Sequence, residues 1–273
     1  MDRSGPLDSE IPPGIDTSVP HSARVWNYWL QGKDNYPVDR EAAERYRATR
    51  PDIVDVARAT RGFLMRTVRQ LTRESGIRQF LDIGTGLPTA NNTHEIAQAI
   101  APECRIVYVD NDPLVLVHAR ALLTSSPEGM TDYLDADVRD PGAILAEAAR
   151  TLDFSRPIAL ILLGIMEHVL DIDRPHEIVR QLLATLPTGS HLVLADPTTE
   201  VVGAAVLESM RRWNESGGHP PIVARSRTEI TRFFDGLELL EPGVVSISQW
   251  RPDPADVGAP VRVNTFGGVG RKP

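Results

Sequence analysis

Hydrophobic residues recur with a helical period between residues 52 and 74. The apolar positions are Ile53, Val56, Ala57, Leu64, Val68 and Leu71. They would form one stripe along a helix, with a proline before it and a glycine after it as start and end signals. The arginines of the segment lie mostly between these positions and predict a solvated face: Arg58, Arg61, Arg66, Arg69 and Arg73. We therefore expect a helix over 52–74, within a largely helical segment 21–75.

From residue 77 the pattern changes to short apolar runs that alternate with helical ones. We expect strands over 78–82, 105–109, 131–134, 158–163 and 191–195, and helices over 94–101, 113–123, 141–150 and 175–186. This alternation is typical of an α/β protein with a mostly parallel sheet and helices on both faces. Residues 158–163 are uniformly apolar, as in a strand that is buried on both faces.

The end of the chain predicts two further strands, over 237–250 and 261–268, joined by a Pro/Asp/Gly-rich loop. They would form an antiparallel hairpin that closes the sheet. The expected organisation is a flexible tail over 1–20, an N-terminal helical cap or lid over 21–76, and a ligand-binding domain over 77–273.

Composition narrows the class of protein. Of 273 residues, 41% are hydrophobic and 24% are charged, which is close to the globular average. A net charge of -8 disfavours a dedicated nucleic-acid binder. A single cysteine, Cys104, excludes a disulfide within the chain and a zinc site built from several cysteines. No apolar stretch is long enough for a membrane helix and the N-terminus is no secretory signal, so we expect a cytoplasmic protein.

A glycine-containing turn follows the first strand of this domain. The sequence from Phe80 to Gly86 runs through Asp82, Gly84 and Thr85, and a helix follows that Asn91, Asn92 or Thr93 would cap. Glycines let a ligand approach the main chain, and ligands of such sheets bind at the carboxyl ends of the strands. The alternative is that both are simple turn glycines.

Acidic residues end the next two strands. Asp110 could accept hydrogen bonds from both ribose hydroxyls, with Asn111 beside it. Asp137 and Val138 could contact an adenine. The alternatives are a helix-capping acid and a solvated loop acid.

The turn also indicates which nucleoside cofactor would bind. A dinucleotide motif has a small third residue where this chain has Thr89, and no phosphate-binding loop is present. The pattern therefore favours S-adenosylmethionine, which has no pyrophosphate. Asp82 would face its ammonium group.

These residues resemble the Rossmann-like (class I) S-adenosylmethionine-dependent methyltransferases. Segments 23–36, 80–91, 107–113 and 266–272 are similar, more narrowly, to an actinobacterial methyltransferase family formerly filed as a domain of unknown function. The resemblance implies a seven-stranded sheet of order 3-2-1-4-5-7-6 with strand 7 antiparallel, and S-adenosylhomocysteine as product. The resemblance does not indicate which molecule accepts the methyl group.

The fourth strand should end beside the reacting methyl group. Gly164 would allow close approach there, and Glu167 and His168 are the candidate catalytic groups that could orient or deprotonate a nucleophile. The alternative is a helix start with one polar face. The Asp/Asn-Pro-Pro-aromatic motif of many amino-group methyltransferases is absent, which disfavours nucleic-acid bases and glutamine as acceptors.

An aromatic group precedes the first long helix. Trp26, Tyr28, Trp29 and Tyr36 could form a lid whose aromatic faces attract the sulfonium, with polar contacts from Arg24, Lys33 and Asn35. The alternative is a helix packed onto the domain. The histidines lack metal-ligand spacing, so we expect no metal.

Three functions remain open from the sequence. The leading hypothesis is in-line methyl transfer from S-adenosylmethionine to an unidentified small molecule. The second is a non-catalytic S-adenosylmethionine-binding protein, and the third is a nicotinamide-dependent oxidoreductase. The sequence leaves the methylated atom and the oligomeric state open.

Overall fold

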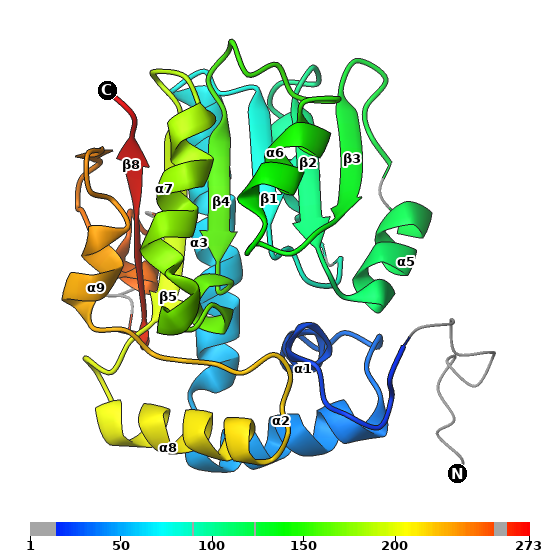
Figure 1. Cartoon of the computed structure of the whole chain (residues 1–273), viewed down its shortest axis with the longest axis vertical. Coiled ribbons are helices and arrows are strands. Elements are labelled where there is room, and N and C mark those ends of the chain that lie inside the picture. Colours follow the sequence, from blue (N-terminus) through cyan, green and yellow to red (C-terminus); the bar gives the residue numbers. More distant parts are fainter. Residues whose placement is uncertain (1–14, 89, 123, 254–260) are drawn as a thin grey trace.

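A mixed sheet forms the centre of the computed structural model, which describes residues 15–88, 90–122, 124–253 and 261–273. The strands are β1 (Gln79–Ile83), β2 (Arg105–Asp110), β3 (Met130–Asp135), β4 (Ala159–Leu163), β5 (His191–Pro197), β6 (Glu238–Leu239), β7 (Val245–Ser246) and β8 (Thr265–Arg271). Their order is β3-β2-β1-β4-β5-β8-β6, and β7 also pairs with β8 (Figure 1). Strands β1 to β5 are parallel, and β8 runs antiparallel to β5. The predicted α/β class and the predicted strand order are confirmed. Strand β8 takes the position of the predicted antiparallel strand 7, and β6 that of the predicted strand 6.

The predicted C-terminal hairpin is wrong in detail. A turn at Gly243, which has a φ of 82°, divides the segment 237–250 into two short strands, so the described part of the sheet has eight strands instead of seven. Strand β8 also begins later than predicted. The Val263 main-chain N–H donates to the side-chain hydroxyl of Ser246, and the Asn264 carbonyl accepts from the Thr198 N–H, so neither residue belongs to a regular strand ladder. The tip of the predicted loop, residues 254–260, lies outside the described residues, as do Thr89 and residues 1–14 of the predicted tail.

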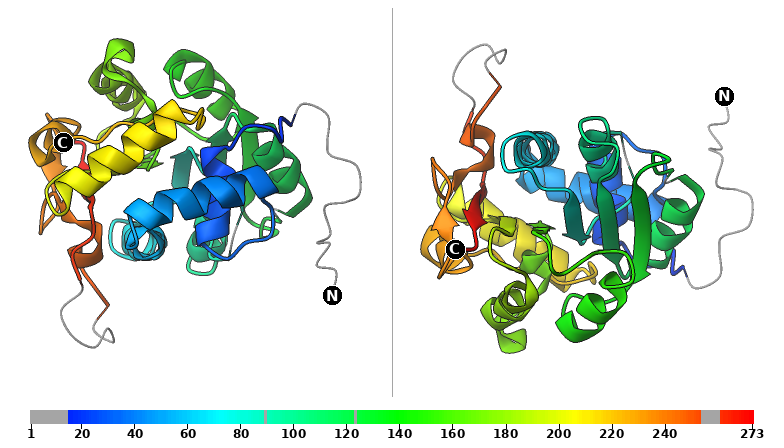
Figure 2. Two further views of the ribbon diagram at one scale, coloured as in Figure 1. Left: turned by 90° about the horizontal axis from the view of Figure 1, so that it is seen from below. Right: turned by 90° about the horizontal axis from the view of Figure 1, so that it is seen from above.

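Helices cover both faces of the sheet. The α-helices are α1 (Ser22–Trp29), α2 (Pro37–Thr49), α3 (Ile53–Arg73), α4 (Thr93–Gln98), α5 (Pro113–Leu122), α6 (Pro141–Ala148), α7 (Pro175–Thr185), α8 (Gly203–Glu215) and α9 (Arg227–Arg232). Three short 3-10 helices are η1 (Met166–His168), η2 (Asp171–Asp173) and η3 (Ile247–Gln249). Helices α6 and α7 pack on one face and α3 on the other (Figures 1 and 2). The apolar stripe predicted over 52–74 is the buried face of α3.

Strand β4 is buried on both faces over its first four residues. Ala159, Leu160, Ile161 and Leu162 are each fully buried, alternately toward the two helical layers. Its uniformly apolar sequence follows from this double burial.

A separate layer of helices lies across the carboxyl ends of the parallel strands. Helices α2 and α8 run side by side below the sheet in Figure 1, and α1 lies between them and the strand ends. The buried carboxylate of Asp39 ties this layer together, since it accepts hydrogen bonds from the main chain of His21 and Tyr36. The layer therefore closes the edge of the sheet at which a ligand is expected.

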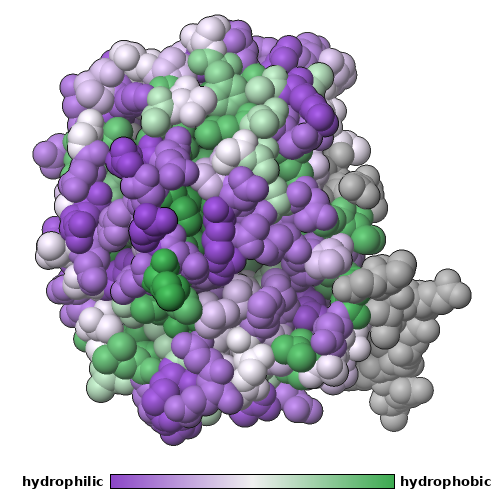
Figure 3. All heavy atoms as spheres, viewed as in Figure 1, coloured by the Kyte–Doolittle hydropathy of each residue, from purple (hydrophilic) through white to green (hydrophobic). Residues whose placement is uncertain are grey.

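The face of the molecule seen in Figure 3 is mainly hydrophilic, with hydrophobic residues in small groups. Within the described ranges, no helix combines the length and apolar character that a membrane crossing requires.

Candidate active site

A cavity lies at the carboxyl ends of β1 and β2, and we call it the turn cavity. It holds about 1000 Å³ of empty space, including the part open to solvent. Its walls come from α1, α3, the glycine turn after β1 and the loop after β4. Seven residues predicted for the cofactor site line this cavity, namely Asp82, Gly84, Thr85, Gly86, Asp110, Asn111 and Gly164. The topology thus brings the ends of three strands to one cavity.

The glycine turn is hydrogen-bonded to Asp110, the acid that ends β2. Gly84 has a φ of 76°, and a Cβ there would lie 2.6 Å from the Ile165 side chain. The Gly86 main-chain N–H donates to Asp110 Oδ2 at 2.8 Å. Asp110 Oδ1 accepts from the N–H groups of Asn111 and Asp112, at 2.9 and 3.0 Å. Three main-chain donors therefore fix the orientation of the Asp110 carboxylate at the cavity wall.

Asp82 is a buried acid at the inner end of this cavity. Its one side-chain donor among the described residues is the Thr93 hydroxyl, at 2.6 Å. Burial raises the pKa of Asp82 to about 6, against the opposing effects of Thr93 and of the guanidinium of Arg61. A cationic group in the cavity would stabilise the ionised form of Asp82.

Arg61 is the cavity residue that the sequence analysis missed. It lines the turn cavity from α3 and donates to the carbonyls of Ala90 and Asn91, at 3.0 and 2.8 Å. The predicted solvated face of α3 is therefore wrong at this position. The spacing of residues could have indicated this position. Arg61 follows Ala57 by four residues and precedes Leu64 by three, so it lies on the same helix face as the apolar stripe.

Arg66 also departs from the predicted solvated face. Its guanidinium donates to the carbonyls of Trp250 and Ile247, at 3.0 and 2.7 Å. It joins α3 to the segment after β7.

A second cavity continues from the turn cavity toward the end of β3, and we call it the side cavity. It holds about 680 Å³ of empty space, including the part open to solvent, and is lined by Asp137, Val138 and the loop that contains His219. Asp137 accepts hydrogen bonds from Arg139 Nη1 at 2.9 Å and from Asn111 Nδ2 at 3.3 Å. Val138 is buried. The two cavities share the Gly84 and Asp110 walls.

The loop after β4 carries both predicted catalytic groups. Glu167 and His168 are buried on η1, and Gly164 precedes them with a φ of 67°. Both line a third cavity beside the turn cavity, with about 640 Å³ of empty space including the part open to solvent, which we call the aromatic cavity. His168 also lines the other two cavities, so it stands where all three meet.

The two groups differ in charge. Burial lowers the pKa of His168 to about 4, so the ring is neutral at pH 7. Its Nδ1 donates to the Pro221 carbonyl at 3.2 Å, because a carbonyl can only accept, and Nε2 is left as an acceptor. Burial and the Asp196 carboxylate raise the pKa of Glu167 well above its ordinary value.

A buried arginine holds this loop. Arg225 donates to the carbonyls of Met166 and Val169, at 2.7 and 2.6 Å. It also pairs with Asp196 of β5 at 2.7 Å. Arg225 thus joins η1 to the end of β5 and fixes Glu167 between them.

Two tyrosines and three polar residues predicted for a lid or substrate contact are not among the residues that line the turn cavity. Arg24 donates to the carbonyls of Asp16 and Val19, and Asn35 bonds to Asn27. Tyr36 is buried at the start of α2, Tyr28 bonds Glu44, and Lys33 is exposed. They shape and connect α1 and α2.

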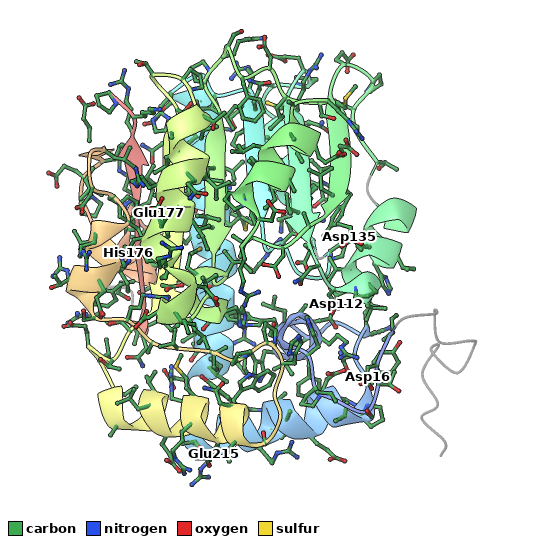
Figure 4. All side chains as sticks on the ribbon, viewed as in Figure 1. Asp16, Asp112, Asp135, His176, Glu177 and Glu215 are labelled. Carbon is green, nitrogen blue, oxygen red and sulfur yellow. The ribbon has the colours of Figure 1, made fainter. Side chains whose placement is uncertain are left out.

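His21, which precedes α1, and four residues of α1 line the turn cavity, namely Ser22, Ala23, Trp26 and Asn27. His21 Nδ1 lies 2.9 Å from Asp112, which Figure 4 labels beside α1. Among the described residues no three His, Cys, Asp or Glu side chains group as a metal site would require.

Comparison with known proteins shows the family of this chain. Residues 8–273 match the model of a family described as S-adenosyl methyltransferase. The crystal structure of a DUF574 family protein from Streptomyces avermitilis is 45% identical, with a TM-score of 0.90, and covers 94% of this chain and 99% of its own. A structure from Thermobifida fusca is 40% identical, with a TM-score of 0.86 and coverage of 96% and 98%.

More distant structures share the fold. The plantazolicin methyltransferase BpumL is 12% identical, with a TM-score of 0.52 over 92% of this chain and 95% of its own. No curated protein matches. The family match spans nearly the whole chain and agrees with the resemblance that the sequence motifs predicted. The chain therefore belongs to the S-adenosyl methyltransferase family, with a Rossmann-like methyltransferase fold.

Proposed function

We propose that this protein transfers a methyl group from S-adenosylmethionine to a small-molecule acceptor. One observation carries the proposal: the glycine turn, Asp82 and Asp110 line one cavity that adjoins a second, aromatic one across Gly164. Membership of the family supports it. When bound, S-adenosylmethionine supplies a methyl group that is already activated by a sulfonium.

The described residues fit this cofactor. Asp110 would take the ribose hydroxyls, because its carboxylate is held at the cavity wall and retains free lone pairs. Asn111 would lie beside the ribose. Asp137 and Val138, which line the side cavity, would contact the adenine.

The amino-acid end of the cofactor would lie at the inner end of the turn cavity. Asp82 would take the ammonium group and Arg61 the carboxylate, since each would then gain an opposite charge. Thr85, Gly84 and Gly86 would offer the main chain of the turn. Gly164 would allow a close approach beside the reacting carbon.

Positioning and exclusion of water would supply most of the catalysis. The residues of α1 that face the cavity, with α2 behind them, would act as the cap over it. Glu167 would hold or accept the proton of the acceptor, and the neutral ring of His168 would orient it through Nε2. Glu167 lines the aromatic cavity and accepts no side-chain hydrogen bond from a described residue, which favours catalysis over cofactor binding alone.

Calorimetric titration with S-adenosylmethionine tests the proposal, with NAD in parallel. We expect micromolar binding of S-adenosylmethionine and none of NAD. Asp110→Ala should abolish binding and leave the fold intact, whereas Asp135→Ala should bind like the parent. Asp135 is the matched control because it is an exposed acid at the end of the neighbouring strand (Figure 4). Unchanged affinity in Asp110→Ala would refute the assigned contact.

A further inference from the structure

The aromatic cavity has an unusual composition for this chain. Three of the four tryptophans of the protein line it, namely Trp26, Trp29 and Trp213, together with Tyr46. The Trp26 and Trp29 rings meet edge to face at 5.6 Å, and Trp29 lies 5.3 Å from Tyr46. Aromatic faces attract flat apolar groups and cations. The cavity thus suits a ligand with an aromatic body.

One buried acid, Glu167, lines this cavity. Glu167 is only 6% exposed, and no described residue donates a hydrogen bond to its carboxylate. A Cβ placed on Gly164 would lie 3.5 Å from Glu167 Oε1, so the carboxylate reaches back to the end of β4. Gly164 lines both the aromatic and the turn cavity. The acid therefore stands where acceptor and methyl donor would meet.

The charges around Glu167 are already balanced without it. Arg50 forms two hydrogen bonds with Asp52, at 2.8 and 2.9 Å. Arg225 pairs with Asp196. The neutral ring of His168 adds no charge at pH 7. An ionised Glu167 would leave the cavity one negative charge in excess.

We infer that the acceptor is a small aromatic amine, which binds as its ammonium ion with the aromatic body among Trp26, Trp29, Tyr46 and Trp213 and the ammonium group on Glu167. For transfer, the ammonium group would give one proton to the Glu167 carboxylate. The freed lone pair of the nitrogen would then form the bond to the methyl carbon, while the carbon–sulfur bond breaks and S-adenosylhomocysteine leaves. This inference rests on the proposed function, since it names the substrate class of the same site. An ammonium ion would supply the missing positive charge and the missing hydrogen-bond donors together. A carboxylate ligand would instead face Glu167 with both nearby arginines already paired.

A ligand series with one aromatic body tests the inference. Tryptamine, tryptophol and indole-3-propionate carry a cation, a neutral hydroxyl and an anion on the same ring system. Each is titrated calorimetrically into the protein in the presence of S-adenosylhomocysteine. The variants are Glu167→Gln and, as a control for loss of one negative charge, Glu215→Gln. Glu215 is exposed near the end of α8 (Figure 4).

We expect tryptamine to bind at least about ten-fold more tightly than tryptophol, and indole-3-propionate to bind weakest. Glu167→Gln should abolish that preference, and Glu215→Gln should keep it. Tryptophol or indole-3-propionate binding as tightly as tryptamine would overturn the inference. So would a preference that survives in Glu167→Gln, or no binding of any of the three.

Titration with S-adenosylhomocysteine separates the two proposals. Normal binding of this ligand together with absent binding of tryptamine overturns the aromatic amine and leaves the proposed function standing. Absent binding of both overturns both. The same titration shows whether Glu167→Gln has folded. If this variant has not folded, the order of the three affinities measured on the parent protein tests the inference.

Discussion

At the scale of single residues, buried charge determines what this protein can bind. The acids at the ends of β1 and β2 could be predicted from sequence, because parallel strands bring their carboxyl ends to one edge. The place of Arg61 at the cavity could not be predicted from sequence, because a run of arginines along one helix is typical of a solvated face. That no described residue donates a hydrogen bond to the Glu167 carboxylate could not be predicted either, since it depends on how the fold pairs Arg225 and Arg50 with other acids.

The pKa of Asp82 predicts a pH dependence of cofactor binding. Burial raises this pKa to about 6, so the carboxyl is ionised at pH 7.5 and mostly protonated at pH 5.5. Protonation removes the charge that would attract the ammonium group. We expect the affinity for S-adenosylmethionine to fall several-fold between pH 7.5 and pH 5.5, as measured by calorimetry. Asp82→Asn should bind weakly at both values, and an equally steep pH dependence in that variant would contradict the assignment.

The raised pKa of Asp82 also determines how the stability of the folded state depends on pH. The folded pKa lies above the unfolded value near 3.9, so protonated Asp82 favours the folded state. Its contribution is complete below pH 3.9 and is lost as the pH rises through 6. A bound cation would offset that loss.

Arg61 gives a second test at this scale. Arg61→Met should weaken S-adenosylmethionine binding roughly 10- to 100-fold, as expected for the loss of a charge-assisted hydrogen bond of about 1.5–3 kcal/mol. Arg58→Met is the control, because Arg58 lies almost one turn away on the exposed side of α3. Equal affinities of the two variants in a titration would remove Arg61 from the site.

At the scale of elements, the alternation of strands and helices predicted the sheet well. The central strands and the helices between them lie within a few residues of their predicted bounds, because each carries its own period of apolar residues. The helix α8 was missed although Val206, Met210 and Trp213 recur at helical spacing. The division of the predicted strand 237–250 depends on a turn at Gly243, whose backbone angles no apolar pattern reveals.

The loop after β4 depends on Arg225 more than on its own sequence. Arg225→Met should lower the free energy of unfolding by about 3–5 kcal/mol, because it leaves Asp196 buried without its partner. Urea denaturation of the parent and the variant measures this difference. Arg227→Met, an exposed arginine two residues later, should change stability little. A loss below about 1 kcal/mol in Arg225→Met would show that the pair does not support the loop.

At the scale of the whole molecule, a Rossmann-like sheet and a layer of three helices enclose the cavities between them. The sheet was predictable and the position of this layer was not, since it follows from tertiary packing of α1, α2 and α8. Ligands that bind between the two parts should stabilise the folded state as a unit. This gives a prediction for the intact protein.

S-adenosylhomocysteine should raise the thermal midpoint of unfolding. At a concentration 100 times its Kd, a ligand that binds only the folded state stabilises it by about 2.7 kcal/mol, which corresponds to several degrees. Differential scanning calorimetry of the parent and of Asp110→Ala measures the shift. A shift of equal size in the variant would contradict the role of Asp110.

A crystal structure grown with S-adenosylhomocysteine is the most direct test of the cofactor site. The account predicts ribose hydroxyls on Asp110, the amino-acid end between Asp82 and Arg61, and the sulfur facing Gly164 and the aromatic cavity. Density for the ligand at any other place, with the turn cavity empty, would contradict it.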